Sequence, residues 1–122
     1  MKVYKTRPFS KWAKSEGVSD NHLLLVVDEM LAGAVEASLG GHLYKKRIAL
    51  NAGKRGGARV ILAFVANDRS FFIYGFAKNE MENIAPKELM ALKGIAKSLL
   101  SYSDQAIQFA IKNGELVEVI KK

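Results

Sequence analysis

Residues 37–67 include six basic side chains and no acidic one, a composition suited to holding a polyanion. The six are Lys45, Lys46, Arg47, Lys54, Arg55 and Arg59. The whole chain has a formal net charge of +7, so this stretch holds nearly all of the excess. Lysine and arginine bind phosphate oxygens and stabilise negative charge that develops on a reacting phosphate. RNA or DNA is therefore the first partner to consider.

These residue types could support RNA cleavage without a metal ion, because RNA supplies its own nucleophile. The 2′-hydroxyl attacks the adjacent phosphate, and nearby cations stabilise the charge that develops. A lysine among other cations can also transfer a proton, as Lys45 could beside Arg47 and Arg59. His22 and His42 are not at metal-ligand spacing and the chain has no cysteine, so we expect no metal site and no cofactor.

A solvated charged face is the alternative interpretation of this stretch. Lysines on strands commonly do no more than prevent edge pairing. Two features argue against it here: the lack of acidic residues, and Arg59 at the start of a very apolar segment. An arginine held by its stem suits bidentate phosphate recognition better than a mobile lysine does.

The basic residues fall on two expected strands, at 42–50 and 58–66, joined by the Gly-rich loop 51–57 (NAGKRGG). A third strand at 70–77 follows a tight turn, so the last two strands form an antiparallel hairpin.

Alternation along the strands places Lys45, Arg47 and Arg59 on one face of the sheet. The opposite face would pack against helices through apolar residues, namely Ile48, Leu50, Val60, Leu62 and Phe64. Lys46 belongs to this second face, and Lys54 and Arg55 lie on the loop.

Aromatic residues alternate along the third strand, and at least two of them should be buried. They are Phe71, Phe72, Tyr74 and Phe76. An exposed member such as Tyr74 could stack on RNA bases. Lys78 follows at the end of this strand, where it can reach the basic side chains.

Helices and strands on both sides complete a single α+β domain over residues 1–122. Before the basic strands we expect a possible edge strand at 2–7, helical turns at 9–15, and a helix from Ser19 or Asp20 to about Ser38. After the third strand we expect a helix from Pro86, a short helix from Ser103 or Asp104 to Lys112, and a strand at 115–120. The N-terminal helices would pack on a twisted antiparallel β-sheet, with further C-terminal helices.

The chain has no apolar run near the ~18 residues of a membrane span. Its N-terminus, MKVYKTRPF, lacks the apolar core of a signal peptide. We therefore expect a soluble cytoplasmic protein with no membrane partner.

The order of these segments resembles the RelE/ParE superfamily of toxins from bacterial type II toxin–antitoxin systems. The match is best over residues 43–84, with YKKRIAL, a basic glycine loop, GGARVILAF and FFIYGFAKNEMENI. The helix from Pro86 and the closing GELVEVI fit a subfamily of short RelE-like proteins.

The resemblance implies a metal-independent mRNA endonuclease that inhibits translation by cutting mRNA on the ribosome. It implies catalytic roles for Arg59, Lys45, Arg47 and Lys78. Lys46, Lys54, Arg55 and Tyr74 would contact mRNA or ribosomal RNA. An acidic antitoxin is the implied protein partner, and a homodimer stays open.

Two alternatives stay open beside this interpretation. ParE-like members inhibit DNA gyrase without catalysis of their own, and an inactive nucleic-acid-binding module would have lost cleavage. The C-terminal catalytic tyrosine of RelE-like proteins has no clear counterpart, and Tyr102 and Tyr74 are equal substitutes for it. The loop between Arg47 and Arg59 also looks long. The residue that transfers the proton is therefore unassigned.

Overall fold

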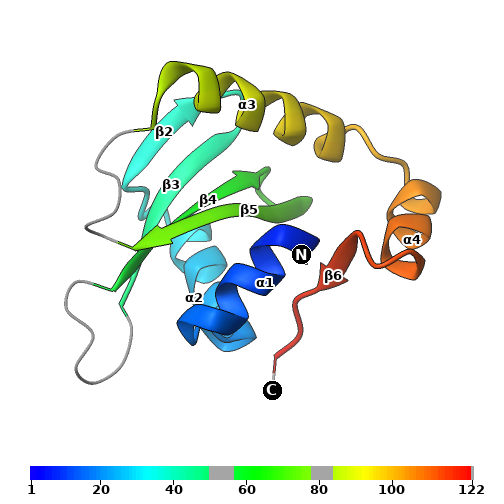
Figure 1. Cartoon of the computed structure of the whole chain (residues 1–122), viewed down its shortest axis with the longest axis horizontal. Coiled ribbons are helices and arrows are strands. Elements are labelled where there is room, and N and C mark those ends of the chain that lie inside the picture. Colours follow the sequence, from blue (N-terminus) through cyan, green and yellow to red (C-terminus); the bar gives the residue numbers. More distant parts are fainter. Residues whose placement is uncertain (50–56, 78–83, 122) are drawn as a thin grey trace.

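The computed structural model describes residues 1–49, 57–77 and 84–121 (Figure 1). The described part contains six strands and four helices. In chain order they are β1 (Lys2–Thr6), α1 (Arg7–Glu16), α2 (Asp20–Leu31), β2 (Ala37–Gly40), β3 (Leu43–Ile48), β4 (Ala58–Phe64), β5 (Arg69–Ala77), α3 (Pro86–Leu100), α4 (Asp104–Lys112) and β6 (Leu116–Glu118).

All six strands join one sheet, in the spatial order β2-β3-β4-β5-β1-β6. The neighbouring pairs are antiparallel except β1 and β5, which run parallel. This confirms the expected α+β class with a mostly antiparallel sheet. The expectation of an edge position for β1 was wrong, because β6 pairs along its outer side through Tyr4 and Glu118.

The two N-terminal helices begin at side-chain caps that the sequence supplies. Thr6 caps α1, and the hydroxyl of Ser19 accepts a hydrogen bond from the backbone of His22 at the start of α2. The His22 ring in turn accepts a bond from the Ser19 backbone at 2.9 Å, which completes a capping box. His22 thus has a structural role at the start of α2.

The helix expected to continue to Ser38 ends at Leu31, and residues 37–40 form strand β2 instead. Gly33 adopts a left-handed conformation with φ +91°, and its backbone N–H donates to the carbonyl of Met30. A glycine in this conformation ends a helix. The apolar spacing that runs on to Ala34 therefore gave a helix seven residues too long.

Both faces of the sheet are covered, so the protein has two apolar cores. The first core lies between the sheet and helices α1 and α2, and includes Phe9, Leu23, Val60, Leu62 and Phe72. The second core lies under α3 and α4, and includes Leu43, Ile61, Phe71, Leu92 and Ile107. Figure 1 shows α1 and α2 on one side of the sheet and α3 arching over the other.

The packing of the first core agrees with the alternation expected for β3 and β4. Ile48, Val60, Leu62 and Phe64 all lie in it, whereas Leu50 falls outside the described residues. Among the β5 aromatics, Phe71, Phe72 and Phe76 are buried and Tyr74 is half-buried. The expectation that at least two would be buried is confirmed.

Candidate nucleic-acid interface

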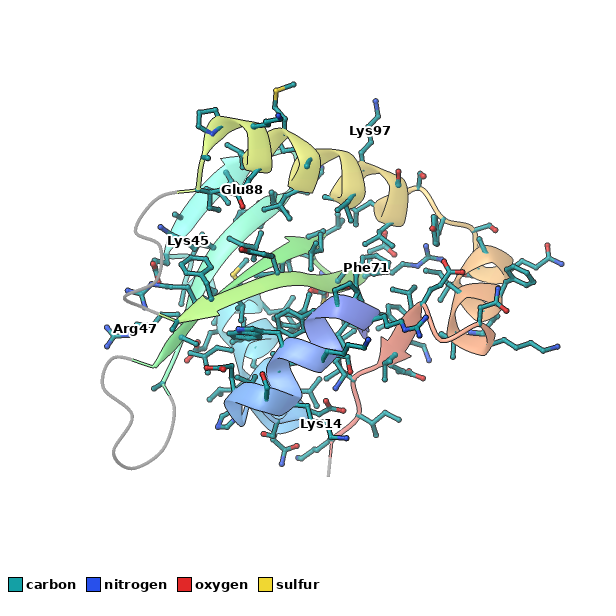
Figure 2. The ribbon with its side chains drawn as sticks, in the orientation of Figure 1. Lys14, Lys45, Arg47, Phe71, Glu88 and Lys97 are labelled. Atoms are coloured by element: carbon teal, nitrogen blue, oxygen red, sulfur yellow. The ribbon has the colours of Figure 1, made fainter. Side chains whose placement is uncertain are left out.

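Three cations gather on the sheet face opposite α1 and α2, at the end of the sheet away from α4. Arg47 on β3 lies directly opposite Arg59 on β4, and Lys45 lies opposite Ile61. Paired residues on adjacent strands point to the same face. We call Lys45, Arg47 and Arg59 the basic face, and Figure 2 shows Lys45 and Arg47 at this end of the sheet.

Two cross-strand rows extend the basic face onto β5. Tyr74 lies opposite Ile61, and Phe76 lies opposite Arg59. One row is therefore Lys45–Ile61–Tyr74, and the next is Arg47–Arg59–Phe76. The rings of Tyr74 and Phe76 are 6.1 Å apart between centroids. A polyanion on this face would meet the half-buried Tyr74 beside the cations, whereas the side chain of Phe76 is buried.

Glu36 holds Arg59 from the segment just before β2. Its Oε2 atom lies 3.2 Å from Nε of Arg59, and the two side chains are 33% and 18% exposed. Nη1 of Arg59 is buried and has no hydrogen-bond partner in the described part of the chain. A guanidinium has five N–H donors, so a carboxylate on its Nε leaves other donors for a ligand. Because Nη1 is closed to solvent, a phosphate would contact Arg59 through the part of its side chain that is exposed.

Sequence reasoning missed Glu36, because the residue was expected on a helix. Glu36 lies immediately before the acid-free stretch that begins at residue 37. An acidic residue at that boundary was the feature from which a partner for one of the cations could have been predicted. Lys45 and Arg47 form no ion pair among the described residues. Within the described residues, therefore, no carboxylate neutralises Lys45 or Arg47.

Lys46 lies on the opposite face of the sheet from Lys45 and Arg47. Its Nζ atom is 2.9 Å from Oε1 of Glu29 on α2, and its side chain is 13% exposed. The structure therefore does not bring Lys46 together with the basic face. Lys54, Arg55 and Lys78 fall outside the described residues, and their roles stay predictions.

The two candidate tyrosines lie at different ends of the sheet. Tyr102 follows α3, and its backbone carbonyl accepts a hydrogen bond from Arg69 at the start of β5. Arg59 pairs with Phe76, seven residues further along β5, which is about 20 Å at the usual rise of a strand. Tyr74 is in the row beside Arg59. Of the two phenols, only that of Tyr74 is near the basic face.

The described residues contain no cluster of three or more histidine, cysteine, aspartate or glutamate side chains that could hold a metal ion. Nor does any described helix have the length and apolar character needed to cross a membrane.

The comparison with protein families identifies one family whose model spans nearly the whole chain. The model of the family described as the RelE toxin of the RelE/RelB toxin–antitoxin system matches residues 1–119 of the chain. The chain therefore belongs to the RelE toxin family. As a RelE-like toxin of a toxin–antitoxin system, it has a cognate antitoxin as its implied partner. A search of curated proteins gave no significant match.

Proposed function

We propose that the protein is a ribosome-dependent mRNA endonuclease that uses no metal ion. The observation that carries the proposal is the direct pairing of Arg47 with Arg59, with Lys45 on the same face. Such an array suits the extra negative charge of a phosphate under attack.

In the proposed reaction the 2′-hydroxyl oxygen of one nucleotide forms a bond to the adjacent phosphorus, and the bond from phosphorus to the 5′-oxygen breaks. The products are a 2′,3′-cyclic phosphate and a free 5′-hydroxyl. Arg59 would stabilise the doubly charged phosphorane, and Arg47 would hold a flanking phosphate. Among the described residues on this face, Lys45 and Tyr74 could move a proton.

Lys46, Lys54 and Arg55 would contact ribosomal RNA, and Lys78 would add charge at the scissile phosphate. These assignments rest on residue type and the family resemblance. Lys46 would have to exchange its contact with Glu29 for one with RNA, whereas Arg47 is exposed and needs no such exchange.

The test is expression of the chain from a tightly controlled promoter in a bacterium, followed by mapping of mRNA 5′ ends. We expect new ends within coding regions, in phase with codons, and their loss in Arg59→Ala. Arg7→Ala is the charge-matched control, because Arg7 is an exposed residue at the start of α1. Cleavage by Arg59→Ala at the wild-type rate would show that Arg59 is not catalytic.

Other outcomes of the same experiment would replace the proposal. Growth arrest with DNA damage and intact mRNA would identify a ParE-like inhibitor of DNA gyrase. No growth arrest would indicate an inactive nucleic-acid-binding module.

A further inference from the structure

A cavity of about 410 Å³ lies at the edge of β5, beside the basic face. Its lining residues come from α1 and from the second half of β5: Pro8, Phe9, Trp12, Ile73, Tyr74, Gly75 and Phe76. The paired register of β1 with β5 stops at Phe72, where β1 gives way to α1. The cavity therefore occupies the place along β5 where the pairing with β1 has ended.

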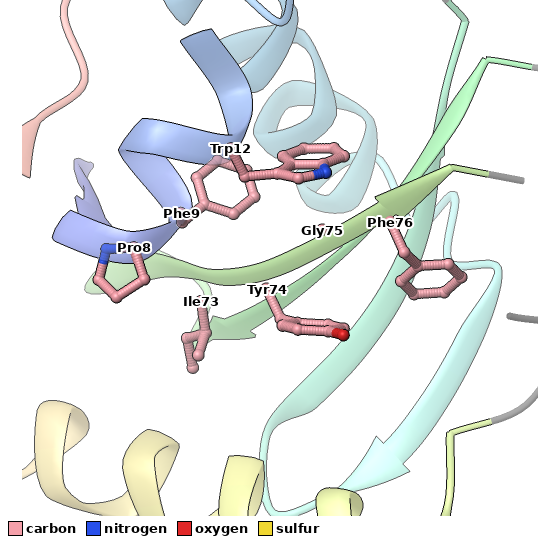
Figure 3. A pocket seen from close by; sticks show the side chains of 7 residues that line it. All are labelled: Pro8, Phe9, Trp12, Ile73, Tyr74, Gly75 and Phe76. Carbon is pink, nitrogen blue, oxygen red and sulfur yellow. The ribbon is translucent and has the colours of Figure 1, made fainter. Parts of the chain in front are cut away.

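Aromatic rings form the walls of this cavity. Trp12 lies against Gly75, so closely that a Cβ atom at residue 75 would be 2.3 Å from the indole ring. Tyr74 and Phe76 lie on the other side of the strand, as Figure 3 shows. Trp12 and Tyr74 are both only half-buried. Glycine at residue 75 is thus what lets the indole line the cavity at this edge.

The cavity adjoins the basic face in register. Phe76, one of its lining residues, lies directly opposite Arg59 on the neighbouring strand. Adjacent strands are about 5 Å apart, so a phosphate at Arg59 is within one nucleotide of the cavity. None of the seven lining residues carries a charge, whereas cations lie alongside. This separation of aromatic and cationic groups matches the base and the phosphate of one nucleotide.

We propose that this cavity binds one nucleobase of the RNA whose phosphate lies on the basic face. The inference rests on the proposed function and adds the residues that hold the base. Tyr74 supplies ring surface on the side of the basic face, where Arg59 and Arg47 fix the RNA backbone, and Trp12 supplies ring surface at the edge of the strand. An apolar side chain of an acidic protein partner could also fill an aromatic cavity, but a flat base stacks on ring faces, which an aliphatic side chain does not.

Trp12 is the single tryptophan of the chain, so its fluorescence reports directly on the cavity. The experiment titrates the purified full chain with an RNA trinucleotide, and with the same trinucleotide lacking its central base. We expect saturable quenching by the first and at least tenfold weaker quenching by the second. Equal quenching by both, or none by either, would overturn the proposal.

Variants of Tyr74 separate stacking from general binding. Tyr74→Leu should weaken base-dependent quenching by roughly 5- to 100-fold, the usual effect of losing one stacking ring, and Tyr74→Phe should retain it. Tyr102→Leu is the matched control at the other end of the sheet. Circular dichroism checks that each variant is folded. Unchanged binding by a folded Tyr74→Leu variant would contradict the base site.

The binding assay contains no ribosome, so its result is independent of cleavage. Base-dependent quenching by a chain that leaves mRNA intact would support the base site and defeat the proposed reaction. Cleavage by a chain without base-dependent quenching would do the reverse. Quenching by an apolar acidic peptide but not by RNA would assign the cavity to a protein partner and overturn the inference.

Discussion

A carboxylate, and not a neighbouring cation, positions the side chain of Arg59. Glu36 binds its Nε atom, and the row that contains Arg59 has Arg47 on one side and Phe76 on the other. This ion pair is partly buried, so the cost of removing the two charges from water offsets much of their attraction. Its value would lie in orientation, because a guanidinium with one edge held presents its remaining donors in a fixed direction.

We therefore expect Glu36→Gln to impair turnover more than binding. The substitution removes a negative charge from the basic face, so RNA should bind no more weakly. The loss of orientation should lower kcat by about tenfold, in line with the effect of misplaced catalytic groups. The measurement is the split between kcat and KM on ribosome-bound mRNA.

Asp28→Asn is the matched control, because Asp28 is an exposed carboxylate on α2, which covers the opposite face of the sheet. It removes the same charge without touching Arg59. A rise in KM with unchanged kcat in Glu36→Gln would mean that Glu36 acts on substrate binding instead.

The sequence alone predicted that the cations of this site share one face, but it did not predict which residues lie beside them. Strand alternation alone was enough to put Lys45, Arg47 and Arg59 on one face, since it depends only on local geometry. Trp12 and Glu36 reach the site from α1 and from the segment before β2, both distant in the sequence from β4. Contacts of that kind depend on tertiary packing, which periodicity does not encode.

At the scale of elements, the apolar strand β4 positions the site. Val60, Ile61, Leu62 and Ala63 are all fully buried, because helices cover both faces of the sheet at this strand. A continuous apolar run is typical of a strand buried on both faces. The continuous apolar run ARVILAFVA therefore indicated that a helix, here α3, also covers the second face. We instead expected the second face to carry the cations.

The connection between α3 and α4 is tied to the sheet by Arg69. Its guanidinium donates to the backbone carbonyl of Tyr102 and pairs with the carboxylate of Asp104. The Arg69 side chain is 14% exposed, whereas that of Asp104 is 99% exposed. The contact with the carbonyl therefore matters more than the ion pair.

We expect Arg69→Gln to lower the free energy of unfolding by about 2 kcal/mol, the usual scale for a charged donor lost from a partly buried hydrogen bond. Asp104→Asn should have a much smaller effect, because its carboxylate is in solvent. Urea unfolding of both variants provides the comparison. Equal effects would mean that the ion pair, not the carbonyl, anchors the connection.

At the scale of the whole molecule, the burial of Tyr4 in the second core makes the free energy of unfolding depend on pH. Tyr4 lies in the second core, stacked on Phe71 with 5.4 Å between ring centroids. Burial raises the pKa of the Tyr4 phenol above its ordinary value of 10.0, and the charge of Glu118 acts in the same direction. The folded state thus holds this proton more tightly than the unfolded state does.

Stability from this difference is fully present below pH 10.0 and is lost as the pH rises through the raised pKa of the folded state. We expect Tyr4→Phe to lose stability less steeply than the parent between about pH 10 and pH 12. Urea unfolding at a series of alkaline pH values measures this slope. Tyr102→Phe is the control, and parallel curves for Tyr4→Phe and the parent would contradict the assignment.

The pairing of β1 with β6 brings together segments from the two ends of the sequence: Tyr4 lies opposite Glu118 and Thr6 opposite Leu116. By contrast, β3, β4 and β5 pair with their neighbours in the sequence. The cost in chain entropy of bringing two paired strands together grows with the length of chain between them. The hairpins that hold the cations therefore depend on short-range closure, whereas the pairing of β1 with β6 depends on long-range closure. Because pairings between distant segments slow folding, we expect the strand β6 to join the sheet after the hairpins have formed.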